Sequence, residues 1–365
     1  MRQSHTSKHV LTAISALALG LAAAPAEDAE TLEWPAVEDA VFAQRDANNL
    51  SPVVAFDTRG RSLMAFNVAM RGRAIPGRFH ELICDGGSFH ALEAGAWVGA
   101  KVAESGEFTL EVTITPAMAE PEAPGVIFAF GNDDGQDFAL LHKKDGLSLT
   151  LGEADPITLF AVEEAGAPVH VLIACGAESW TAYRDGEPAA TGDMPADLPT
   201  WQARELVMGA NWASEHPWHG RLEAIAVFPR ALSSDEAATQ AKASAALRAD
   251  REPATTVHFK GTLLRQAETS PVGEIRPYTR SLTFAEYKVD EVIEGDWEEP
   301  TIMVAHWMIM DAERLPIADR EPGVEVELGV ELMDQHPQLE SMRRDDLPDA
   351  DLDAVPFYAE SDSAP

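Results

Sequence analysis

The sequence has 365 residues, and its 61 acidic residues outnumber its 27 lysines and arginines, which gives a formal net charge of −34. A chain of this length can form two ordinary domains, each with its own core. A surface this negative repels phosphate backbones and anionic lipid headgroups, so the charge argues against nucleic acid and membrane surfaces as partners.

The N-terminus has the pattern of a signal peptide. Arg2 and Lys8 precede an apolar run from Val10 to Ala24, and Ala24-Pro25-Ala26 forms a small-x-small cleavage site. The apolar run, at about 15 residues, is short for a membrane span, although an uncleaved N-terminal anchor is the open alternative. We therefore predict a signal peptide over residues 1–26 and a secreted or periplasmic protein without membrane insertion after cleavage.

Two cysteines, Cys84 and Cys175, permit one disulfide in an oxidising compartment. Cys175 lies in the apolar run VHVLIACG, where an unpaired buried thiol is equally ordinary. The sequence leaves their pairing open. Neither cysteine has the CxxC or Cys/His spacing of a zinc site.

From Phe108 to Phe228 the chain reads as short strands separated by polar turns. The segment FTLEVTI places Phe108, Leu110, Val112 and Ile114 on one face, and Asp-Gly pairs mark two hairpin turns. Regular short strands of this kind predict antiparallel sheets packed as a sandwich. The predicted strands cover residues 108–114, 126–131, 138–144, 147–152, 168–176, 179–192, 205–211 and 221–228.

The pattern changes after Pro229. Ser233, with Glu236 three residues later, predicts a capping box that starts an alanine-rich helix. We expect this helix and a linker over residues 233–256, a second β domain over 257–344 and a disordered acidic tail over 345–365. Residues 27–84 are interpreted as strands and loops that lead into the sandwich.

The closing strand of the sandwich carries a family resemblance. The text WHGRLEAIAVFPRALSSDE, residues 218–236, resembles the last strand of laminin G-like, concanavalin A-like jelly-roll domains. The hairpin SWTAYRDGEPAATG and the strand LVMGAN resemble other strands of the same fold. The resemblance covers about Asp85 to Ala246 and implies a jelly roll, taken here as residues 85–232. It also implies that Trp218 packs in the core.

The family mostly binds glycans, proteins or calcium, and some relatives are glycoside hydrolases or lyases. The fold therefore does not decide the function. The second β segment weakly resembles a five-stranded OB-like barrel of the netrin and tissue-inhibitor-of-metalloproteinase type, through Val257 to Leu264, YKVDEVIEG and TIMVAHW. That family's N-terminal cysteine is missing, so metalloproteinase inhibition is not implied.

Two rim loops contain the candidate binding residues. In the loop before the last strand, Trp212 is the candidate for stacking on a sugar ring, with hydroxyl contacts from Asn211, Glu215 and His216. In the turn GNDDGQD, calcium is the candidate metal, and an ordinary hairpin turn is the alternative. Its candidate ligands are Asn132, Asp133, Asp134 and Asp137.

No catalytic pattern is evident. A glycoside hydrolase of this fold requires two carboxylates on one strand face, whereas Glu111 and Glu223 each stand alone in their strands. The sequence therefore favours an all-β, exported, non-catalytic protein that binds a glycan or a cell-surface protein. A carbohydrate-active enzyme with an unrecognised site and a structural envelope protein are the alternatives.

Overall fold

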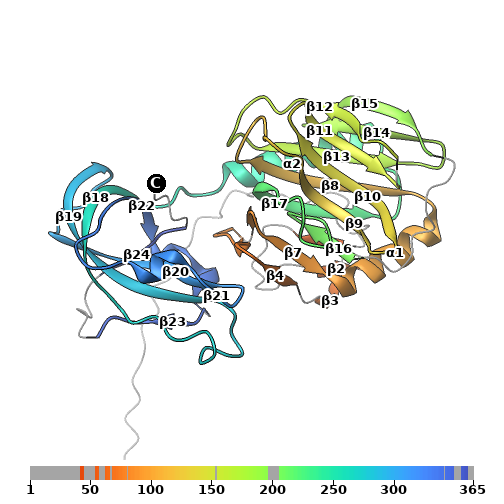
Figure 1. Ribbon diagram of the computed structural model, residues 1–365. Helices are drawn as coiled ribbons and strands as arrows, with labels where there is room; N and C mark the ends of the chain where they lie inside the picture. The colour runs from red at the N-terminus through yellow and green to blue at the C-terminus, as the bar shows by residue number, and fades with distance from the viewer. Residues whose placement is uncertain are drawn as a thin grey trace, which may run out of the picture. The chain divides into compact units, whose positions relative to one another are not determined.

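The computed structural model describes residues 42–44, 54–56, 62–65, 68–79, 81–152, 154–195, 205–340, 342–348 and 355–360. All of them belong to one compact unit, Trp34–Pro365. Their strands form three sheets, here called A, B and C, and the first two build the sandwich (Figure 1). The predicted signal peptide lies outside the described residues.

Sheet A is antiparallel and has β17 near its centre. Its strand order is β15 (Glu187–Asp193), β14 (Ser179–Arg184), β13 (Val169–Cys175), β8 (Phe108–Pro116), β17 (His219–Phe228), β1 (Phe42–Gln44), β2 (Val54–Phe56) and β3 (Ser62–Ala65). The start of β17 also pairs with β6 (Leu82–Asp85), which in turn pairs with β5 (Ile75–Pro76).

Sheet B packs against it. Its order is β12 (Ile157–Phe160), β11 (Gly146–Leu151), β10 (Gly135–Lys143), β9 (Gly125–Asn132), β16 (Glu205–Met208), β7 (Ser88–Ala91) and β4 (Ala69–Arg71). Because strands β1 to β6 all pair within these two sheets, the region up to residue 85 belongs partly to the sandwich.

The core lies between sheets A and B and follows from strand alternation. Phe108, Leu110, Val112 and Ile114 of β8 are buried in one apolar cluster with side chains of β9, β10 and β11. Phe108 meets Phe138 of the opposite sheet edge-to-face, with ring centroids 5.3 Å apart. Helix α1 (Leu92–Ser105) contributes side chains to the same cluster. The predicted jelly-roll sandwich is confirmed.

Helix α2 (Ser234–Ala249) begins at the predicted capping box, in which Ser233 and Glu236 each bond the other's backbone. Ala237 packs with Leu172, Tyr183 and Phe228 of sheet A, so the helix covers part of that sheet's outer face. The strong cap compensates for a helix whose alanine-rich surface gives little apolar area to bury.

Sheet C forms a closed five-stranded barrel in the C-terminal part. Its strands are β18 (Thr256–Gln266), β19 (Ser281–Glu294), β20 (Thr301–Met310), β22 (Glu325–Leu332) and β24 (Pro356–Tyr358), with the short β21 (Glu313–Arg314) and β23 (Arg344–Asp345) at its ends. Three 3-10 helices, η2 (Pro316–Asp319), η3 (Met333–Gln335) and η4 (Pro337–Leu339), connect them.

The prediction of a disordered tail is wrong for residues 345–348 and 355–360, which the structure describes. Strand β24 pairs with both β20 and β22, and Phe357 and Tyr358 are buried. Asp345 accepts hydrogen bonds from the backbone N and Oγ of Ser270. The composition of the tail is acidic, but the apolar pair Phe357 and Tyr358 is buried in the barrel wall.

Cys84 and Cys175 are both free and buried. Burial raises the pKa of each thiol, which keeps both in the unreactive protonated form. None of the helices within the described residues is long and apolar enough to cross a membrane.

The buried pair His142 and Trp218 makes stability depend on pH. The carbonyl of Ala119 can only accept, so His142 Nε2 carries the proton that reaches it (3.1 Å), while Nδ1 accepts from Trp218 Nε1 (3.3 Å). A proton on Nδ1 would oppose the indole N–H, and burial already lowers the pKa of His142. The imidazole is therefore neutral in the folded protein.

We predict that this contribution to stability is complete above about pH 6.5, the unfolded pKa of histidine, and is lost as pH falls through the lower folded pKa. His142→Asn should cost about 1–3 kcal/mol at pH 7.5 and clearly less at pH 5. Urea unfolding at both values measures this. The half-exposed His258→Asn is the control, and an equal loss from His142→Asn at both pH values would contradict the prediction.

Candidate functional site

The two predicted rim loops lie against each other. The turn at Asp133 and Asp134 joins β9 to β10, and the loop from Gly209 to Trp218 joins β16 to β17. A Cβ added to Gly131 would lie 2.5 Å from Trp212 Cζ3 and 2.8 Å from Cε3. The six-membered ring of Trp212 therefore rests on the backbone of Gly131, which is possible because that residue has no side chain.

The Trp212 loop is held by bonds within itself. The backbone N of Glu215 donates to Asn211 Oδ1 (2.7 Å), and the backbone N of Asn211 donates to the carbonyl of Glu215 (3.0 Å). Asn211 Nδ2 approaches Glu215 Oε2 at 3.4 Å. Ser214 and His216 adopt left-handed backbone conformations, with φ of 61° and 54°. Asn211 and Glu215 thus set the shape of the loop that presents Trp212.

Sheet B adds polar side chains beside this loop. Phe89 and Ala91 point into the core, so Ser88 and His90 lie on the opposite face of β7. His90 Nε2 is 3.0 Å from Ser88 Oγ and 3.4 Å from Ser214 Oγ of the loop. His90 therefore connects the sheet to the Trp212 loop.

Glu205 completes the group. Its Cα is opposite Gly131 in the register of β16 and β9, and its Oε2 lies 3.6 Å from His90 Nδ1. We call Ser88, His90, Glu205, Trp212 and Ser214 the rim cluster. Within it the structure joins an indole ring, two hydroxyls, an imidazole and a carboxylate.

The electrostatics of the rim cluster favour neutral His90. Burial lowers the pKa of His90, and the adjacent Glu205 carboxylate only partly opposes that change. A neutral imidazole offers one donor and one acceptor. The serine, histidine and glutamate stand in the order of a catalytic triad, but 3.6 Å between His90 and Glu205 is too long for a hydrogen bond. Ser88 is only 1% exposed, so its hydroxyl is shielded from solvent in this structure.

The predicted calcium ligands do not converge. Asp133 and Asp134 are exposed in the turn, whereas Asp137 is buried on β10 at a bulge in its pairing with β9. Asn132 Oδ1 accepts from the backbone N of Asp134 (3.0 Å), as in an ordinary tight turn. Among the described residues no three His, Cys, Asp or Glu side chains form a metal-binding group. Calcium at this hairpin stays a prediction.

Sequence reasoning did not find Ser88, His90 or Glu205. The alternation in Ser88-Phe89-His90-Ala91 was a usable signal for two polar residues on one strand face. The pairing of β7 with β16, which brings His90 next to Glu205 across more than a hundred residues, has no local signature.

Comparison with known families agrees with the fold. Residues 92–238 match the family model of the concanavalin A-like lectin/glucanases superfamily. This confirms the predicted relationship for the stretch from α1 into α2. No curated protein matches the chain.

Several solved structures are similar at low identity. Trypanosoma rangeli sialidase, in complex with 2,3-difluorosialic acid, is 17% identical with a TM-score of 0.42 over 57% of this chain, which spans 33% of the sialidase chain. Domain 4 of AbnA, an extracellular GH43 arabinanase from Geobacillus stearothermophilus in complex with arabinotriose, is 12% identical with a TM-score of 0.42, over 56% of this chain and 98% of that one.

The CBM40 of a Ruminococcus gnavus IT-sialidase, bound to alpha2,3 sialyllactose, is 18% identical with a TM-score of 0.32, over 36% of this chain and 80% of that one. No site residue or activity is transferred from these structures.

The contact between Trp212 and Gly131 is testable. Gly131→Ala should displace the indole ring and cost about 1–3 kcal/mol in the free energy of unfolding. The same substitution in a Trp212→Ala background should cost less, because the obstructing ring is gone. Denaturant unfolding of the four proteins gives the coupling energy. Gly176→Ala is the control, since its added Cβ meets nothing closer than 3.5 Å; additive costs at Gly131 and Trp212 would contradict the packing.

Proposed function

We propose that this protein is an exported, non-catalytic binding protein that recognises a neutral glycan through the rim cluster of its jelly roll. The observation that carries the proposal is the Trp212 ring packed on Gly131, in a loop whose Ser214 contacts His90, which in turn faces Glu205. An aromatic face with adjacent hydrogen-bonding groups matches a sugar ring, which has an apolar C–H face and a hydroxyl edge.

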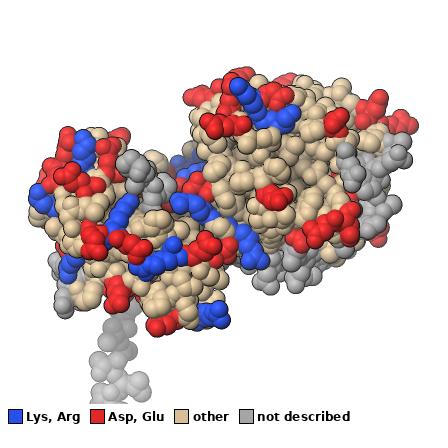
Figure 2. All heavy atoms as spheres, viewed as in Figure 1, with Lys and Arg blue, Asp and Glu red and all other residues tan. Residues whose placement is uncertain are grey.

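Charge favours a neutral ligand over an anionic one. Asp133, Asp134, Glu205 and Glu215 all belong to the two rim loops or the strand between them, and the whole chain has a net charge of −34. On the face shown in Figure 2, acidic and basic side chains are interspersed rather than gathered into one basic patch. An acidic polysaccharide would be repelled unless a cation bridged it to the carboxylates.

Preorganisation supports affinity. The loop bonds between Asn211 and Glu215 and the packing of Trp212 on Gly131 exist before any ligand arrives. A platform that is already ordered loses little side-chain entropy on binding. The family description, lectin/glucanases, agrees with carbohydrate recognition and leaves the enzyme alternative to experiment.

The test is binding of the chain from residue 27 onward to neutral polysaccharides (glucan, galactan, mannan, xylan and arabinan) by affinity electrophoresis and calorimetry. Trp212→Ala should weaken binding about tenfold or more, because it removes the central aromatic contact. The matched control is Trp297→Ala, which truncates a half-buried tryptophan of the barrel. Binding to none of the polysaccharides would overturn the proposal, and release of reducing sugar would identify an enzyme instead.

Calcium is tested separately. If the hairpin binds the ion, chelation with EDTA and the double variant Asp133→Asn/Asp134→Asn should each weaken glycan binding and lower the melting temperature, since both remove ligand oxygens or the ion itself. Calcium should restore the wild type and leave the double variant unchanged. Glycan binding that is the same with EDTA and with calcium would exclude a role for the ion.

A further inference from the structure

A second concave site lies at the start of β17 and shares no residue with the rim cluster. The cavity has a volume of about 280 Å³, close to the lower end of ordinary ligand pockets, about 300–1,000 Å³. Part of its lining is apolar, from Ile75, Ile83, Pro116 and Met310. The remaining wall carries four charged side chains, Arg73, Asp85, Arg221 and Glu360.

The charges of this pocket are matched in pairs. Arg73 Nε lies 3.2 Å from Asp85 Oδ2, and Arg221 Nη2 is hydrogen-bonded to Glu360 Oε1. Two arginines and two carboxylates line the wall, and Glu81 behind Arg221 adds a third carboxylate, so the group carries a net negative charge. All four side chains are partly exposed, between 26% and 48%, so a ligand can reach them.

The pairs retain bonding capacity. Asp85 also contacts His219 through Oδ1, at 3.3 Å from Nδ1. Only the Nε of Arg73 bonds to a side chain among the residues that the structure describes. A guanidinium group has five N–H donors, and each carboxylate oxygen has two acceptor positions. The pocket therefore presents free donors and free acceptors next to each other.

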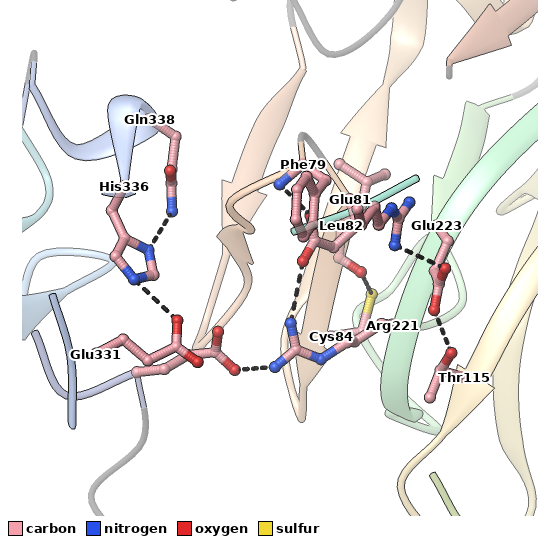
Figure 3. Close-up of polar contacts among 12 residues, drawn as sticks. Phe79, Glu81, Leu82, Cys84, Thr115, Arg221, Glu223, Glu331, His336 and Gln338 are labelled. Carbon is pink, nitrogen blue, oxygen red and sulfur yellow. Dashed lines mark hydrogen bonds and ion pairs between the residues drawn. The ribbon is translucent and has the colours of Figure 1, made fainter. Parts of the chain in front are cut away.

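Glu81, which does not line the pocket, holds the guanidinium group of Arg221 in place. Glu81, which is 3% exposed, accepts from Arg221 Nη1 through Oε1 (3.0 Å) and from the backbone N of Phe79 through Oε2 (2.7 Å; Figure 3). Burial lowers the pKa of Arg221, but Glu360 and Glu81 outweigh it and raise the pKa overall. Gly77 leaves room for the Glu81 carboxylate, because a Cβ there would lie 2.2 Å from Glu81 Cδ.

We propose that this pocket binds one neutral sugar ring. A hydroxyl group donates one hydrogen bond and accepts others, so it can bridge a carboxylate and a guanidinium that are already paired. An anionic ligand would be attracted by the two arginines and repelled by the three carboxylates that pair with them. The apolar side of the pocket suits the C–H face of the ring. Sugar binding in this pocket does not depend on glycan binding at the rim cluster.

The experiment is calorimetric titration of the full-length protein with the methyl glycosides of glucose, galactose, mannose, xylose and arabinose, and with sodium glucuronate as the anionic counterpart. We expect saturable binding of at least one neutral glycoside and weaker binding of glucuronate. Asp85→Asn should lower the affinity about tenfold, the equivalent of one charge-assisted hydrogen bond. Asp85 is about half exposed, so this variant keeps the fold.

A second experiment blocks the pocket with a large side chain. Ala117 is exposed and lines the pocket, so Ala117→Trp should fill it and abolish binding. The neighbouring Met118 is exposed outside the pocket, and Met118→Trp should bind as the wild type does. No saturable binding, binding that survives Ala117→Trp, or a preference for glucuronate would overturn the assignment. Monosaccharide binding that disappears in Trp212→Ala would belong to the rim and would sink this proposal while supporting the first.

Discussion

The burial of Trp218 is the constraint on which both sites depend. Its indole N–H bonds to His142, and its backbone N donates to the carbonyl of Gly209 at 2.8 Å, which closes the loop that carries Trp212. Added Cβ atoms at Gly125 and Gly220 would meet Trp218 at 3.0 and 2.5 Å. The backbone at Gly220 thus closes on the indole ring, and the backbone at Gly125 closes on the Cα of Trp218. Removing a buried tryptophan costs about 3–5 kcal/mol.

Strand β17 links the buried Trp218 to the pocket. It starts directly after Trp218 and is hydrogen-bonded to β6 and β8 along the same stretch. That pairing puts His219 opposite Asp85 and Arg221 opposite Ile83, so the register alone assembles much of the pocket wall. The rim loop lies before Trp218 and the pocket after it. One buried residue therefore fixes the geometry of two surfaces that share no side chain.

The sequence predicts what depends on local patterns. Alternation in FTLEVTI, the Asp-Gly turns and the capping box at Ser233 each reflect physics within a few residues, and the sandwich and helix α2 follow from them. The burial of Trp218 was implied by the family resemblance of its strand. The contact of Arg221 with Glu360 joins positions 139 apart, and His90 meets Glu205 only through strand pairing. Strand β24 was missed for a related reason, since its two apolar residues are ordered by the barrel they complete.

At both proposed sites the carboxylates already face a basic side chain. A glycoside hydrolase needs one carboxylic acid and one free carboxylate, about 5–9 Å apart, flanking the bond that breaks. In the pocket, Asp85 and Glu360 are each committed to an arginine. Burial raises the pKa of Glu360, and Arg221 opposes that change only in part. At the rim, Glu205 is the carboxylate that faces His90 among the residues that the structure describes. Carboxylates held in this way can still accept hydrogen bonds from hydroxyl groups, which is the chemistry that the proposed glycan binding requires.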